Sequence, residues 1–74
     1  MLEGLNKIGI HTDHISLDQL LKWENIASTG GEAKLLIKNG KVKINGEIET
    51  RRGKKVVPGD IVTVDEIEYR VEKI

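Results

Sequence analysis

The chain of 74 residues contains no cysteine, a single proline and only two aromatic residues, Trp23 and Tyr69. The absence of cysteine excludes disulfides, thiolate zinc sites and cysteine nucleophiles, and it suits a reducing interior. No apolar run approaches the roughly 20 residues of a membrane-spanning helix. The N-terminal segment also lacks the long apolar core of a signal peptide. We therefore expect a cytoplasmic protein with no membrane partner.

Length and composition indicate one small folded domain. A chain of this size buries roughly 60% of the surface that its unfolded state exposes, which is enough for one modest core. Apolar residues make up 38% of the chain and charged residues 32%. Although this composition is polar, the apolar residues recur in ordered patterns, and we therefore expect a folded chain rather than a disordered one.

The net charge is zero, with 12 basic and 12 acidic residues, but the two signs are segregated along the chain. Residues 34–55 contain eight cations and two anions, whereas residues 1–33 and residues 56–74 each carry a net charge of −3. Four of the eight cations lie in one short segment, Glu49–Lys55, which reads ETRRGKK. Segregation of this kind creates a local field even when the total charge cancels.

The first of two predicted helices covers residues 17–25. Leucines at positions 17, 20 and 21 recur at helical spacing and supply its apolar face. Ser16 and Gln19 have the spacing of a capping box at its start. Trp23 follows the leucines, and we expect it to pack in the core or at the edge of the helix rather than to stack on a ligand.

The second predicted helix begins at once, with Thr29 as its cap and Glu32 at the capping-box spacing. Lys34 and Lys38 lie four residues apart and therefore share one face of this helix. Asn39-Gly40 supplies a left-handed stop. The apolar stripe consists of Ala33, Leu36 and Ile37.

Beyond Lys41 the apolar period changes to two, which indicates strands. Asn45-Gly46 turns the chain between the first two of them. If Val42 and Ile48 share the buried face, the turn needs three residues and a bulge near Gly46, and we predict this register. Lys41 and Lys43 would then share the solvent face with Glu47 and Glu49.

Further strands are predicted on either side of these elements. A short strand over residues 7–11 precedes the helices, and Pro58-Gly59 turns the chain into a strand over residues 61–64. After a turn at Asp65-Glu66, the alternation from Ile67 predicts the last strand. The predicted fold class is α+β, with two short helices packed on a small, mainly antiparallel sheet of four to five strands.

The cations come from the second helix, the first hairpin strand and the ETRRGKK segment, and they can converge on one phosphate-binding surface. The alternative is that Lys41 and Lys43 pair with the hairpin glutamates, in exposed pairs that contribute about 0–1 kcal/mol. Pairing of this kind does not explain the four cations between Arg51 and Lys55. Because neither aromatic residue falls in the basic segment, the pattern favours folded RNA over splayed single strands.

The segment TGGEAK at the second helix start has two interpretations. Gly30 and Gly31 would let a phosphate approach the free N–H groups of a helix N-terminus. Alternatively, the glycines only form a tight turn between the helices, while Thr29 and Glu32 satisfy those N–H groups.

Candidate catalytic groups are sparse. His11, Asp13 and His14 could hold a metal, but no further ligand cluster accompanies them. A nucleophile at Ser28 or Thr29 with a histidine base has no supporting motif. We therefore expect no enzyme activity, no metal and no cofactor.

Four features follow one another in order over residues 15–64. They are a leucine-bearing helix, a small-residue turn, the segment EAKLLIKNGKVKING and the segment PGD. This set resembles the S4-like RNA-binding domain. GGEAK and ETRRGKK further resemble the short stand-alone bacterial branch of that superfamily. The resemblance implies that residues 1–74 form a single domain containing an alpha-L motif, in which two helices and a hairpin grip structured RNA.

By resemblance, the partner is structured RNA, either rRNA or tRNA, in a ribosome-associated role that involves the ribosome or a ribosomal subunit. We expect a non-enzymatic monomer. The alternative is a ribosome-associated protein–protein interaction adaptor that uses acidic faces at Asp65–Glu72 or Asp13–Glu24. The residues expected to contact RNA are Thr29, Gly30, Gly31, Lys34, Lys38, Lys41, Lys43, Arg51, Arg52, Lys54 and Lys55.

Overall fold

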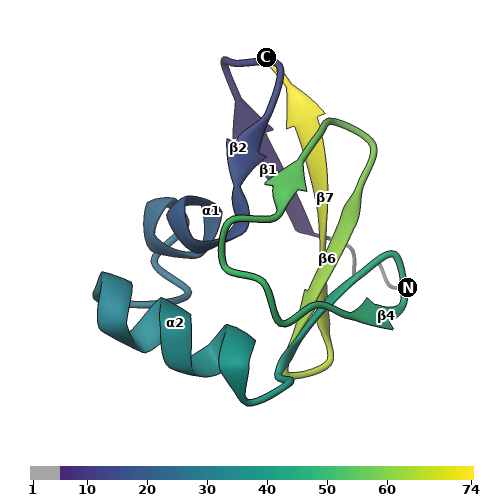
Figure 1. Cartoon of the computed structure of the whole chain (residues 1–74). Helices are drawn as coiled ribbons and strands as arrows, with labels where there is room; N and C mark the ends of the chain where they lie inside the picture. Colours follow the sequence, from purple (N-terminus) through teal and green to yellow (C-terminus); the bar gives the residue numbers. More distant parts are fainter. Residues whose placement is uncertain (1–5) are drawn as a thin grey trace.

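A computed structural model describes residues 6–74 (Figure 1). Residues 1–5, which open the segment considered above for a signal peptide, lie outside the described residues. Two helices, α1 (Leu17–Trp23) and α2 (Gly30–Lys38), lie on one side of a five-stranded sheet of order β1-β7-β6-β3-β4. Its strands are β1 (Asn6–Ile10), β3 (Val42–Ile44), β4 (Glu47–Ile48), β6 (Ile61–Val64) and β7 (Ile67–Lys73). A second sheet pairs β2 (Ile15–Ser16) with β5 (Lys55–Val56).

The predicted α+β class, with two short helices on a mainly antiparallel sheet, is confirmed by this architecture. Within residues 6–74 the exception to antiparallel pairing is β1, which runs parallel to β7. Neither α1 nor α2 is long and apolar enough to cross a membrane.

The core lies between the helix pair and the sheet. Each helix contributes its predicted stripe, and the strands contribute every second residue, because side chains alternate between the two faces of a strand. Full burial of one such aliphatic side chain stabilises the fold by about 1.5–3 kcal/mol. The largest fully buried side chains are Ile8, Leu17, Leu20, Leu21, Ile37, Val42, Val56, Val62 and Val71.

The predicted capping box at the start of α1 is wrong. Ser16 occupies the N-cap position, but its side chain makes no capping hydrogen bond. The N–H of Leu17 instead donates to the carbonyl of Lys54 at 2.9 Å, and the N–H of Asp18 donates to the carbonyl of Arg52 at 3.1 Å. Carbonyl groups of a distant loop therefore accept the free N–H groups of the first turn. In a capping box a side chain next to the helix would accept them instead.

The ends of both helices follow from backbone conformations. α1 stops at Trp23, earlier than predicted, and Asn25 takes a left-handed φ of 58° that a helix cannot continue through. In α2 the predicted cap is confirmed, because the N–H of Glu32 donates to Thr29 Oγ1 at 3.1 Å. The predicted stop is confirmed as well, since Gly40 has a φ of 75°.

The predicted three-residue hairpin turn is wrong. Lys43 lies opposite Ile48 and Ile44 lies opposite Glu47, so the turn consists of Asn45-Gly46 alone. Both turn residues have positive φ, 51° and 88°, as the tightest hairpin turn requires. Ile48 is consequently 59% exposed. Because β4 is a two-residue edge strand, the turn rather than burial fixes the register.

Asn45 also ties this turn to β6. Its Oδ1 accepts a hydrogen bond from the N–H of Ile61 at 2.9 Å, and its Nδ2 donates to Asp60 Oδ1 at 3.1 Å. The hairpin turn and the start of β6 are therefore held as one unit.

We expect Asn45→Ala to lower the free energy of unfolding by about 2 kcal/mol, because it removes these hydrogen bonds and a residue that tolerates positive φ. Asn45→Gly keeps the backbone freedom and should cost about half as much. Urea denaturation of the three proteins measures both values. Wild-type stability in both variants would contradict the assigned role of Asn45.

Candidate nucleic-acid interface

The segment Glu49–Lys55, called the basic loop below, connects the sheet to the helix pair. Figure 1 shows this connection leaving β4 and passing the start of α1 before it enters β5. The carbonyls of Arg52 and Lys54 accept the two N–H groups that open α1. The pairing of Ser16 with Lys55, between β2 and β5, fixes the end of the loop. The cations of the basic loop thus project from a backbone that is held at several points.

Arg51 is neutralised within the loop. Its Nε lies 2.9 Å from Glu49 Oε2 and its Nη2 lies 3.2 Å from Glu49 Oε1, so the guanidinium grips the carboxylate with two nitrogens. The backbone N–H of Arg51 also donates to Glu49 Oε2 at 3.0 Å. These hydrogen bonds lower the pKa of Glu49 from 4.5 to about 2, and the carboxylate raises the pKa of Arg51. Arg51 therefore adds little net positive charge to the surface.

The remaining predicted contact cations make no ion pair with any carboxylate of residues 6–74. In the alternative considered above, Lys41 and Lys43 pair with the hairpin glutamates. The structure does not show this pairing, and Glu49 binds Arg51 instead. All of these cations are exposed except Lys54, which is half-buried. They are Lys34, Lys38, Lys41, Lys43, Arg52, Lys54 and Lys55.

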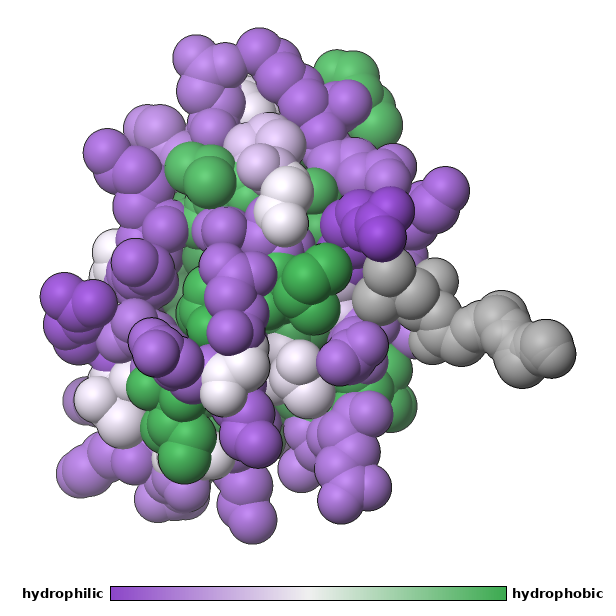
Figure 2. All heavy atoms as spheres, turned by 90° about the vertical axis from the view of Figure 1, so that its right-hand side faces the viewer, coloured by the Kyte–Doolittle hydropathy of each residue, from purple (hydrophilic) through white to green (hydrophobic). Residues whose placement is uncertain are grey.

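These cations do not form one continuous cluster. Val42 and Ile44 face the helices, so Lys43 between them points from the opposite, outer face of the sheet. There it shares a row with Thr63, its partner on β6, and with Glu68, the partner of Thr63 on β7. Figure 2 views the molecule from the side away from the helices, where hydrophilic residues predominate and hydrophobic ones show between them. Lys43 belongs to this face and not to the basic loop.

On the helix side of the molecule, two of the predicted contact segments, the basic loop and the start of α2, lie on either side of α1. α1 lies between them, with the basic loop at its start and the beginning of α2 near its end. A Cβ atom on Gly30 would lie 3.8 Å from Lys22 Cδ, so the lysine side chain runs along the first turn of α2. Lys38 and Lys41 lie farther along, at the other end of α2, where the N–H of Lys41 donates to the carbonyl of Leu36.

Both interpretations of the TGGEAK segment find support at the start of α2. Thr29 caps the N–H of Glu32, and the Glu32 carboxylate accepts the N–H of Ser28. The N–H groups of Gly30 and Gly31 have no acceptor within residues 6–74. The acidic side chain is thus turned back onto the preceding loop, which leaves the two glycine N–H groups available to an anion.

Two exposed side chains beside this surface were not among the predicted contacts. Trp23 was expected to pack in the core or at the edge of the helix, and at 66% exposure it does not lie in the core. Helical spacing from Leu17, Leu20 and Leu21 leads next to position 24 and not to position 23, so Trp23 lies off the centre of the apolar face. This spacing is the signal that the sequence offered. Lys22 is exposed as well and was not predicted.

The described residues show no metal centre. Within residues 6–74 no group of three or more His, Cys, Asp or Glu side chains gathers where it could hold an ion. Asp13, considered above with the two histidines, pairs instead with Lys73 at 2.6 Å.

Residues 8–72 match the model of the S4 domain family. The chain belongs to the S4 domain family. This S4 domain is 38% identical over 60 residues to the "Probable ribosome maturation protein RlbA" of Bacillus subtilis, covering 81% of this chain and 84% of the relative. It is 42% identical over 50 residues to the "Putative RNA-binding protein YbcJ" of Escherichia coli, covering 68% and 71% of the two chains.

Solved structures agree with this assignment. The solution structure of Escherichia coli YbcJ, described as revealing an alpha-L motif involved in RNA binding, is 35% identical with a TM-score of 0.64. The match covers 93% of this chain and 86% of YbcJ. The crystal structure of the 30S ribosomal protein S4e of Thermoplasma acidophilum is 20% identical with a TM-score of 0.69. That match covers 80% of this S4 domain and 31% of S4e, and it concerns the fold alone. The predicted alpha-L motif is therefore confirmed.

The ion pair in the basic loop predicts the titration of Glu49. Its folded-state pKa is depressed, so the pair stabilises the fold above pH 4.5, and this contribution is lost as the pH falls from 4.5 towards 2. In an NMR titration we expect Arg51→Gln to raise the pKa of Glu49 towards 4.5. Arg52→Gln, the matched control, should leave it near its wild-type value. Equal shifts in both variants would contradict the pairing.

Proposed function

We propose that this S4 domain is a non-enzymatic RNA-binding module that grips structured RNA, either rRNA or tRNA. It acts as a monomer in the cytoplasm and associates with the ribosome or a ribosomal subunit. The observation that carries the proposal is the fixed basic loop, in which Arg52 and Lys55 are exposed and free of any carboxylate partner within residues 6–74. A surface of this kind suits phosphates, whose neutralisation releases counterions.

The proposed interface centres on the helix side of the molecule. Arg52, Lys54 and Lys55 would position one stretch of RNA backbone, and the start of α2 with Lys34 would receive a second. Lys38 and Lys41 would extend this contact along α2. Arg51 would contribute least, because Glu49 compensates its charge. Lys43, on the outer face, would lie outside this contact unless the RNA wraps around the sheet edge.

Relatives support this proposal through their names. RlbA carries the name "Probable ribosome maturation protein". YbcJ carries the name "Putative RNA-binding protein", and its solution structure is described as revealing the alpha-L motif involved in RNA binding. A relative at 40% identity over 50 residues is the small ribosomal subunit protein uS4m of Schizosaccharomyces pombe, of which the match covers 15%. Contacts to phosphates would set the register on the RNA and carry little base information.

The test measures affinity for a folded RNA stem by fluorescence anisotropy across a salt series. In the double variant Arg52→Gln/Lys55→Gln we expect an affinity loss of about tenfold or more, because each cation neutralises phosphate charge. The slope of log affinity against log salt should fall by about 1 for each lost contact.

Two matched variants sharpen this test. Arg51→Gln removes a cation from the same loop, but one already paired with Glu49, and should weaken binding less than Arg52→Gln. Arg70→Gln removes an exposed cation of β7 on the outer face of the sheet, away from the helix side, and should leave the affinity unchanged. An unchanged affinity and salt slope in the double variant, or an equal loss in Arg70→Gln, would refute the proposed interface.

A further inference from the structure

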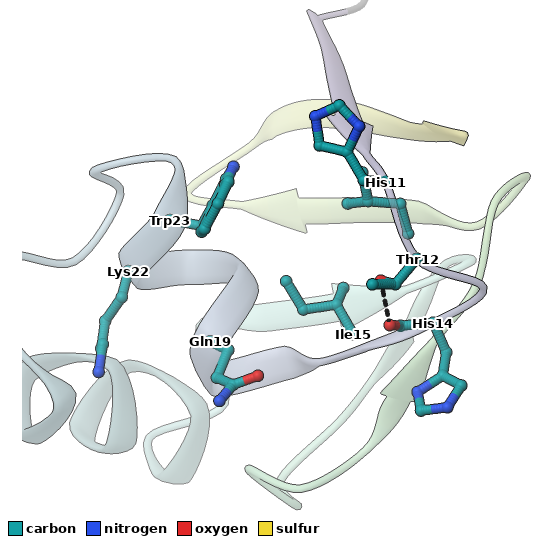
Figure 3. Close-up of a pocket in the computed structure, with 8 residues that line it drawn as sticks. His11, Thr12, His14, Ile15, Gln19, Lys22 and Trp23 are labelled. Atoms are coloured by element: carbon teal, nitrogen blue, oxygen red, sulfur yellow. Dashed lines mark hydrogen bonds between the residues drawn. The ribbon is translucent and has the colours of Figure 1, made fainter. Parts of the chain in front are cut away.

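A groove runs between α1 and the connection from β1 to β2. Its volume is about 590 Å³, and Ile10, Ile15 and Trp23 supply its apolar walls. His11 and Gln19 add polar groups to the lining. Figure 3 shows the Trp23 and His11 rings on one side of Ile15, while the His14 ring points away from Trp23. The groove therefore offers a flat aromatic surface beside groups that can donate and accept hydrogen bonds.

Trp23 contributes little to the stability of the fold. Its side chain is 66% exposed, whereas the leucines of the same helix are fully buried. Its indole N–H has no acceptor within residues 6–74. A tryptophan usually buries a large apolar area and finds a partner for its N–H group. Here both the ring face and the N–H group are left for a ligand.

The connection that forms the opposite wall is braced in place. Thr12 Oγ1 donates to the carbonyl of His14 at 2.7 Å, which closes a tight turn (Figure 3). Asp13 at the tip of this turn binds Lys73 at the end of β7. The wall is thus formed before any ligand arrives, and a bound group would not need to order it.

Cations lie at both ends of the groove. Lys22 lines it and extends away from Trp23 along the first turn of α2, close to Gly30 (Figure 3). At the other end, a second hollow shares His14, Ile15 and Gln19 with the groove and is lined by Lys55 of the basic loop. Residues that line the groove therefore also border the proposed RNA interface, Lys22 beside the start of α2 and Gln19 beside the hollow lined by Lys55.

We propose that the groove receives one unpaired nucleobase of the bound RNA, stacked on the indole of Trp23. This inference rests on the proposed function. A nucleotide carries a flat π surface between two phosphates, which matches an aromatic ring between two cations. Lys22 would meet one flanking phosphate and Lys55 the other. Gln19, whose amide both donates and accepts, would contact the polar edge of the base.

Two model RNAs test this proposal, namely a fully paired stem-loop and the same stem with one bulged nucleotide. Trp23 is the one tryptophan of the chain, so its fluorescence reports stacking directly. We expect the bulged RNA to quench it and the paired RNA to leave it nearly unchanged. Trp23→Ala should weaken binding of the bulged RNA by about five- to 150-fold, the range of one base–aromatic stack. It should not alter binding of the paired RNA.

The control variant is Ile67→Ala, which truncates another exposed apolar side chain on β7 and should change neither affinity. Circular dichroism with a thermal melt checks that Trp23→Ala folds, as its exposure predicts. If both RNAs bind wild type and Trp23→Ala equally, or if Trp23→Ala weakens both to the same extent, the groove proposal is refuted while the proposed function stands. If neither RNA binds the wild-type protein at low salt, the proposed function fails and the groove proposal fails with it.

Discussion

Two backbone hydrogen bonds, from Leu17 to Lys54 and from Asp18 to Arg52, join the start of α1 to the basic loop. Each side supplies peptide groups that its own secondary structure leaves unpaired, because the first turn of a helix has free N–H groups and an irregular loop has free carbonyls. The contact thus satisfies both segments at once. It also means that folding itself places the cations of the loop before any partner is present.

The distribution of charge follows from this arrangement. The chain is neutral as a whole, and a random mixture of its charges would give no surface preference. Glu49 compensates Arg51 within the loop, and Asp13 compensates Lys73 at the other end of the fold. The cations of both pairs, Arg51 and Lys73, remain largely exposed to solvent, which limits what each pair contributes to stability. Their larger effect is to leave Arg52 and Lys55, which have no carboxylate partner within residues 6–74, as the loop groups that an anionic partner would meet.

α1 organises the whole helix side of the molecule. Its buried leucines fix it to the core, its start holds the basic loop, and Lys22 near its end follows the first turn of α2. The exposed ring of Trp23 lies on the same helix. A single seven-residue helix therefore positions the cations, the glycine N–H groups at the start of α2 and the aromatic surface relative to one another. Rigid placement of this kind lowers the entropic cost of binding.

The sequence by itself determined the two helices and the strands of the five-stranded sheet, because hydrophobic period, Thr29 as a cap and the glycine turns are local properties of the chain. The short pair of β2 and β5 was not predicted. It also determined the family and the position of the basic segment. Only the tertiary structure decided that the basic loop, and not Ser16, caps α1, that Arg51 is neutralised, and that Lys43 faces away. These outcomes depend on which distant groups meet. A side chain such as Trp23 is buried or exposed according to where the rest of the chain packs, and no local pattern fixes that.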